Sequence, residues 1–196
     1  LYAYALGRYS GLWTSLKLMK DTVEVTSVVD ARVDRMSFVQ PDFAMPEGGL
    51  NIRLGDHWVP QESRLIDHKR FAAEAFARAN RPDRRVIGKP GAKIGFVAAG
   101  KNWLDLVHAL SLLGVDEASA DRLGITTYKV GQVFPMDMVS FREWADGLDL
   151  IVVVEEKRKL IEVQIKEAIF DDRRGRRVYG WHKTAPGMPQ RQELFQ

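Results

Sequence analysis

Charged and amide side chains gather at two places where an apolar run is followed by a helical pattern. The first place holds Lys101 and Asn102, which follow the apolar run 94–99 after Gly100. The second directly follows the apolar run 148–154 and holds four charged residues: Glu155, Glu156, Lys157 and Arg158. The carboxyl ends of parallel strands meet at one edge of a sheet, the edge that α/β folds use for contacts. We therefore expect these six residues to face another domain or a bound anion.

These residues do not form a catalytic set. Glu155 and Glu156 are adjacent, and adjacent residues of a strand point to opposite faces, so the pair is not expected to act as general acid and base. Gly100 is the lone glycine of its turn, whereas dinucleotide and phosphate loops need a glycine series or a Gly-Lys-Ser/Thr sequence. The chain has neither a Gly-x-Ser-x-Gly elbow nor a pair of histidines at helical spacing. We predict no catalytic residue, no metal ligand and no cofactor-binding residue in this chain.

Composition narrows the classes of protein further. The chain has 196 residues, of which 45% are hydrophobic and 28% charged, enough for one sizeable core. A net charge of +3 is too small to indicate a nucleic-acid partner, and the absence of cysteine excludes disulfides and thiolate-ligated clusters within the chain. No apolar stretch is long enough to span a membrane, and no secretory signal precedes Ser10. We expect a soluble, cytoplasmic protein.

Hydrophobic periodicity predicts the elements that would position the charged groups. Residues 26–51 are expected to be extended and loop-like. The first predicted helix covers 10–24, with Ser10 as its N-cap, and the second covers 61–79. A third begins at Asn102 as N-cap and ends at Gly114. The remaining predicted helices are 117–123, 135–146 and 158–170. The predicted strands are 94–99, 125–130, 148–154 and 178–181.

Strands that alternate with helices at this spacing indicate parallel pairing through right-handed crossovers. The sequence therefore predicts an α/β fold of three layers, α/β/α, with a mostly parallel sheet. The change in composition near residue 90 is too weak to mark a second core, so we expect one domain.

Several separate blocks resemble the middle region of indolepyruvate ferredoxin oxidoreductases of the long, single-chain bacterial type, in the same order and spacing. The opening block, residues 5–13 with Lys17 and 21–24, looks like the end of the pyrimidine-binding domain of that family. The remaining blocks are 94–105, 112–117, 123–131, Phe134-Pro135, 152–158, Ile161-Glu162 and 164–167. Where the family usually has Met and Trp, this chain has Gln132 and Phe134, which leaves the particular 2-oxo acid open.

The resemblance implies an enzyme that oxidatively decarboxylates an aryl 2-oxo acid to an acyl-coenzyme A. Such an enzyme uses thiamine diphosphate with Mg, passes electrons through iron–sulfur clusters to ferredoxin, and works as a homodimer. Residues 26–196 would be its transketolase C-terminal-like domain, and residues 1–25 the end of the preceding domain or an N-terminal helix. The cofactors would be bound by other domains, so this chain would serve assembly and be inactive alone. The anion expected at the charged edge would then be a phosphate of coenzyme A.

A second hypothesis is a free-standing α/β module that binds a nucleotide or another anion. It rests on the Gly100 turn and on the arginine-rich turn 173–177. No aromatic residues are interleaved with those arginines, as they are in single-strand binders, so a hinge loop is the simpler interpretation of that turn.

Overall fold

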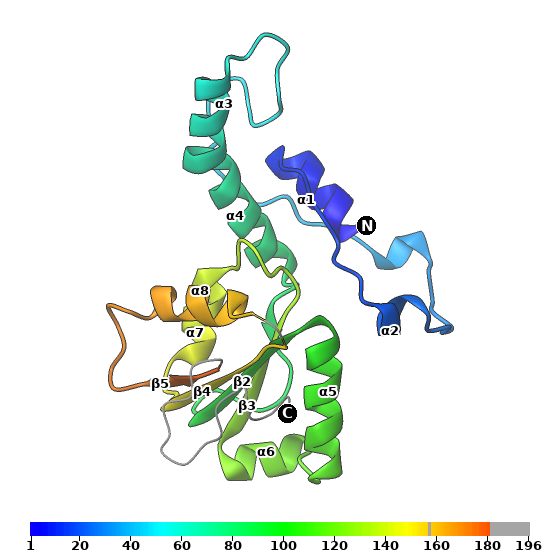
Figure 1. Cartoon of the computed structure of the whole chain (residues 1–196), viewed down its shortest axis with the longest axis vertical. Coiled ribbons are helices and arrows are strands. Elements are labelled where there is room, and N and C mark those ends of the chain that lie inside the picture. The colour runs from blue at the N-terminus through cyan, green and yellow to red at the C-terminus, as the bar shows by residue number, and fades with distance from the viewer. Residues whose placement is uncertain (157, 181–196) are drawn as a thin grey trace. The chain divides into compact units, whose positions relative to one another are not determined.

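The computed structural model describes residues 1–156 and 158–180, which fall into two compact units (Figure 1). Unit 1 is Leu1–Arg81 and unit 2 begins at Pro82. Residues 1–25 belong to unit 1 because helix α1 (Tyr2–Ser10) contacts helix α4 (Arg70–Asn80). The expected domain 26–196 therefore spans parts of both units. The origin of residues 1–25 in a pyrimidine-binding domain stays a prediction.

Unit 1 has a small core around one long helical segment. This segment consists of α3 (Trp58–Arg64), a π-helical stretch η2 (Leu65–Lys69) and α4, so the helix predicted over 61–79 is confirmed and is longer at its start. Buried Leu6, Ala73 and Phe76 form the core, with aromatic side chains of the unit packed around Phe76. The expectation of a loop-like segment over 26–51 is confirmed, apart from the 3-10 turn η1 (Val33–Arg35).

The helix predicted over 10–24 is wrong. Ser10 ends a helix instead of beginning one: its Oγ donates to the carbonyl of Leu6 at 2.7 Å, inside α1. Gly11 follows in the left-handed conformation with φ 67°, and a Cβ there would lie 2.3 Å from the carbonyl oxygen of Leu50. A glycine stop signal thus outweighed the apolar periodicity. The only helical part of 11–24 is α2 (Lys20–Val23).

Unit 2 is built on a five-stranded sheet in the order β1-β3-β2-β4-β5. Strands β2 (Ile94–Ala99), β3 (Ile125–Val130), β4 (Leu150–Val154) and β5 (Arg177–Tyr179) pair in parallel. The mostly parallel sheet is therefore confirmed. A further strand, β1 (Arg84–Arg85), pairs antiparallel with β3 at the edge of the sheet and was not predicted. Two arginines carry no apolar signal for a strand.

Helices cover both faces of this sheet, which confirms the three layers (Figure 1). One face packs against α5 (Gly100–Leu112), with α6 (Glu117–Leu123) beside β3. The other face packs against α7 (Met138–Ala145) and α8 (Leu160–Ala168). Side chains of β2 alternate between the two cores: Phe96 and Ala98 face α5, while Val97 lies in the core of α7 and α8.

The remaining boundaries differ from the predictions by a few residues. Helix α5 begins at Gly100, so Asn102 lies inside its first turn and is not the N-cap. Helices α7 and α8 are shorter than predicted. Strand β5 ends at Tyr179, and Trp181, the last residue of the predicted strand, lies outside the described residues. Among the residues that the structure describes, no helix has the length and apolar character needed to cross a membrane.

Candidate functional site

The candidate site is the carboxyl edge of the unit 2 sheet, at the point where the crossovers diverge. After β2 the chain turns into α5 on one face, and after β4 it turns into α8 on the other. Since β2 and β4 are neighbours, their ends form a topological switch point, where open α/β sheets bind ligands and partners. The structure therefore brings the Lys101 group and the Glu155 group to one edge, as their sequence positions indicated.

Glu155 is engaged by its own chain. Its Oε1 accepts hydrogen bonds from the backbone N–H groups of Leu160 at 3.0 Å and Ile161 at 2.7 Å, and its Oε2 accepts from Glu162 at 3.0 Å. These are N–H groups of the first turn of α8, which have no partner within the helix. A carboxylate also complements the positive end of the helix dipole. Glu155 therefore caps α8 and fixes the 155–159 loop.

The other predicted site residues have varied surroundings. Lys101 is half-buried, and its Nζ bonds both carboxylate oxygens of Asp105 at 2.9 and 2.8 Å. Asn102 is also half-buried, whereas Glu156 and Arg158 are exposed. Lys157 lies outside the described residues. That these side chains face another domain or a phosphate of coenzyme A stays a prediction.

A buried carboxylate that the sequence analysis did not single out holds the next loop of this edge. Asp83 Oδ1 accepts from the backbone N–H groups of Gly131 at 2.6 Å and Gln132 at 2.8 Å. Its Oδ2 accepts from the N–H of Asp137 at 3.5 Å. Asp83 stands in a Pro-Asp-Arg-Arg sequence that resembles an exposed turn, so only the fold shows that it is buried.

The buried carboxyl group of Asp83 has no cation among the groups that affect its pKa. Desolvation raises the pKa of Asp83 to about 6, and the backbone hydrogen bonds offset only part of this effect. Asp137 is also buried; its Oδ1 accepts from Val139 N and its Oδ2 accepts from the Ser140 hydroxyl. The Tyr128 hydroxyl is buried without a hydrogen-bond partner in the described part of the chain, and burial together with Asp83 raises its pKa. The cluster fixes the loop between β3 and α7.

Two carboxylates at this edge, Asp83 and Glu155, bind backbone N–H groups and give the edge structural support. Within residues 1–156 and 158–180, no three His, Asp or Glu side chains come together in a way that could hold a metal ion. Of the buried acids near this edge, Asp83 and Asp137 accept hydrogen bonds from backbone N–H groups, and Glu162 in the first turn of α8 accepts one from the Lys166 ammonium. That the ligands of the Mg that accompanies thiamine diphosphate belong to other domains stays a prediction.

Comparison with known proteins assigns the family. Residues 84–196 match the family model of the indolepyruvate oxidoreductase domain. The chain belongs to this family. The match covers unit 2 from β1 onward, and it confirms the resemblance found in the sequence. It does not favour the hypothesis of a free-standing anion-binding module.

Individual relatives of the chain are also indolepyruvate oxidoreductases. The chain is similar to the indolepyruvate oxidoreductase subunit IorA of Thermococcus kodakarensis, with 30% identity over 92 residues, or 47% of this chain and 13% of that subunit. The corresponding subunit of Pyrococcus abyssi gives the same values. The matched region is thus a small part of these relatives.

Two solved structures share a weak likeness. A 2-oxoglutarate:ferredoxin oxidoreductase from Magnetococcus marinus has a TM-score of 0.41 at 14% identity, covering 91% of this chain and 28% of that one. A split-gene transketolase has a TM-score of 0.36 at 17% identity, covering 50% and 31%. Because both scores are low, the fold is assigned from the strand pairing alone.

The capping role of Glu155 predicts a specific loss of stability. Glu155→Ala should lower the free energy of unfolding by about 1–2 kcal/mol, since three backbone N–H groups lose their acceptor. The exposed neighbour is the control: Glu156→Ala should change it by less than about 0.5 kcal/mol. Urea unfolding followed by circular dichroism measures both variants. Equal effects of the two substitutions would contradict the capping role.

The buried Asp83 predicts a pH dependence of stability. Its pKa is about 6 in the folded chain against an ordinary value of 3.8, so folding favours the protonated form. This group therefore lowers stability as the pH rises from about 4 through 6. Relative to Asp83→Asn, the native chain should gain about 1 kcal/mol of unfolding free energy between pH 7 and pH 5.

Urea titrations at the two pH values measure this difference. The exposed Asp149→Asn serves as the control, because it should leave the pH dependence of the native chain unchanged. An Asp83→Asn variant whose stability follows pH in the same way as the native chain would contradict the account of this cluster.

Proposed function

We propose that the chain is a non-catalytic assembly domain of a thiamine diphosphate-dependent 2-oxo acid ferredoxin oxidoreductase that acts on aryl 2-oxo acids such as indolepyruvate. The family match over residues 84–196 supports the enzyme class. The small share of the relatives' length that the chain matches supports the role of one domain among several. In this proposal the oxidative decarboxylation takes place on residues of other domains.

The observation that carries the assembly role is the use of the acids at the carboxyl edge. In an α/β enzyme this edge usually supplies the catalytic groups. Here Glu155 binds the first turn of α8, and Asp83 binds the loop after β3. Both carboxylates are occupied by backbone N–H groups of their own chain, so they would serve to shape the edge and not to transfer protons.

The proposal assigns cofactors and partners to the complete enzyme. Thiamine diphosphate, Mg and the iron–sulfur clusters would be held by other domains, which are the direct partners of this chain. Ferredoxin and coenzyme A would be partners of the whole cytoplasmic enzyme, which we propose to be a homodimer. Residues 1–25 would continue from its pyrimidine-binding domain.

The charged residues at the carboxyl edge would face those partners. The six residues concerned are Lys101, Asn102, Glu155, Glu156, Lys157 and Arg158. Of the described ones, Glu156 and Arg158 are exposed, and Arg158 would take part in the intermolecular contact. Glu155 would contribute indirectly, by fixing the loop that carries them.

Titration calorimetry of the isolated chain tests this assignment. We expect no heat of binding for thiamine diphosphate with Mg²⁺, because the residues that bind it would belong to other domains. Coenzyme A is titrated separately, because an assembly domain could bind it weakly at the charged edge. If such binding is measured, Arg158→Ala should remove the binding of coenzyme A. Tight binding of thiamine diphosphate would overturn the proposal.

A further inference from the structure

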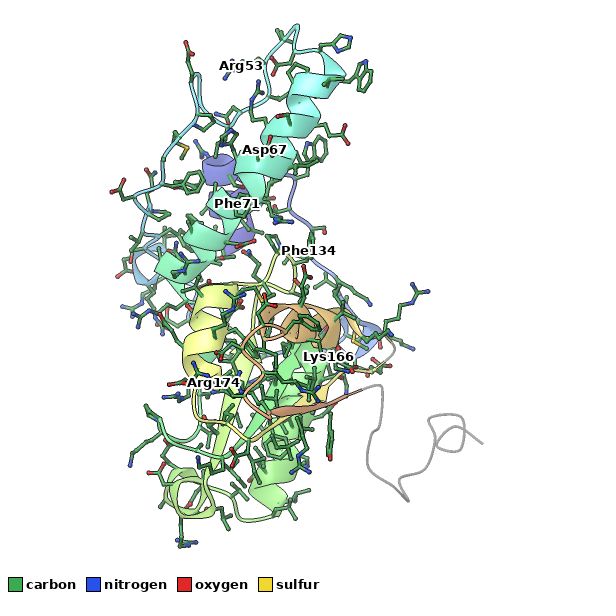
Figure 2. All side chains as sticks on the ribbon, turned by 90° about the vertical axis from the view of Figure 1, so that its left-hand side faces the viewer. Arg53, Asp67, Phe71, Phe134, Lys166 and Arg174 are labelled. Carbon is green, nitrogen blue, oxygen red and sulfur yellow. The ribbon has the colours of Figure 1, made fainter. Side chains whose placement is uncertain are left out.

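An arginine-rich turn lies at the amino edge of the unit 2 sheet, opposite the carboxyl edge. It joins α8 to β5, and β5 runs parallel to β4, so the turn lies beside the start of β4. Residues 171–177 contain four arginines and two aspartates, which give the segment a net charge of +2. Arg174 pairs with Asp172 in the segment and with Asp146 at 3.2 Å, and Figure 2 shows it on the turn close to the end of α7.

Backbone and side-chain hydrogen bonds fix the shape of this turn. The backbone N–H of Arg176 donates to the carbonyl of Arg173 at 2.8 Å, and Arg173 Nε donates to the carbonyl of Arg176 at 3.1 Å. The two central residues, Arg174 and Gly175, have φ values of 47° and 75°, as in a type I′ turn. The Arg173 guanidinium is therefore held against the backbone of Arg176.

Arg176 is a buried cation at this turn. It is 4% exposed, whereas the other residues of 171–177 are all exposed. Its Nε is buried and has no hydrogen-bond partner in the described part of the chain. Asp146 and Asp172 do not supply an acceptor, since both pair with Arg174. A buried guanidinium N–H without an acceptor is unfavourable, because it has lost its hydrogen bonds to water.

An oxyanion would supply the acceptor that Arg176 lacks. The N–H groups of a guanidinium form a planar fork that binds two oxygens of a phosphate or carboxylate side by side. Phosphate fits this turn better than carboxylate, because it has a further oxygen for a second guanidinium, that of Arg173. Its charge of about −2 at neutral pH also matches the net charge of the segment.

We propose that the 173–177 turn is a phosphate-binding site, in which Arg176 binds two oxygens of the phosphate and Arg173 binds a third. The ligand is inorganic phosphate or the terminal phosphate of a small molecule, since both present the same oxygens. A hinge loop, the simpler interpretation of this turn from its sequence, does not account for a buried guanidinium without an acceptor. The site lies away from the carboxyl edge, so the inference does not depend on the proposed assembly role.

Calorimetric titration of the full chain with inorganic phosphate tests the site, at neutral pH and at an ionic strength held constant with sodium chloride. We expect saturable binding with a dissociation constant on the order of 1 mM. Arg176→Gln should weaken binding roughly tenfold or more, and Arg176→Lys should weaken it similarly, because an ammonium cannot replace the planar fork. The matched control, Arg122→Gln, removes an exposed arginine of α6 and should change the constant less than about twofold.

A second variant keeps the test independent of the stability of the Arg176 variants. Circular dichroism checks the fold of each variant, and Arg173→Gln changes an exposed residue, so it should retain the native spectrum and still weaken binding several-fold. The proposal is overturned if phosphate does not bind saturably, if Arg173→Gln or a folded Arg176 variant keeps the native affinity, or if Arg122→Gln loses as much.

Titration with ADP under the same conditions distinguishes the two sources of the phosphate. Binding of ADP that is tighter than that of inorganic phosphate, and that Arg176→Gln weakens, supports the site and identifies a phosphorylated small molecule as the ligand. Binding of ADP that is no tighter, with inorganic phosphate still dependent on Arg176, supports the site and identifies the free ion. Tighter ADP binding that Arg176→Gln leaves unchanged would place the phosphate elsewhere and contradict the proposal.

Discussion

Burial of β2 on both faces is the constraint on which the rest of unit 2 depends. This strand is apolar throughout and pairs in parallel with β3 on one side and β4 on the other. Phe96 and Ala98 face α5, whereas Val97 lies in the core of α7 and α8. Both faces therefore need a helical layer, and the crossovers must leave the sheet on opposite sides. That divergence creates the carboxyl edge at which the charged residues meet.

The fold uses its acids to shape this edge. Glu155 satisfies the first turn of α8, and Asp83 satisfies the loop after β3. Each is costly to replace, since backbone N–H groups would lose their acceptor. The result is a preformed surface on which Phe134 and Arg158 are exposed. Such a surface suits an assembly domain, because rigid contact groups lose little entropy when a partner binds.

Much of unit 2 could be predicted from its sequence, because apolar runs bounded by glycines have few alternatives. The ranges 117–123 and 125–130 agree residue for residue with α6 and β3. Prediction failed where a single local signal decided the structure. Gly11 ends helix α1 at the place where the periodicity favoured the start of a helix over 10–24. The buried position of Asp83 depends on contacts nearly fifty residues away. The charged edge was foreseen as a location, but the hydrogen bonds that Glu155 accepts from the first turn of α8 were not.

Hydrogen–deuterium exchange provides the most direct test of the claim that the carboxyl edge is an assembly surface. Peptides that cover the 131–136 loop and the first turns of α8 are compared between the isolated chain and the assembled oxidoreductase. The account predicts slower exchange in both peptides on assembly, and no further change when thiamine diphosphate and substrate are added. Protection that is absent on assembly and arises only with cofactor or substrate would contradict it, because the edge would then belong to a catalytic site.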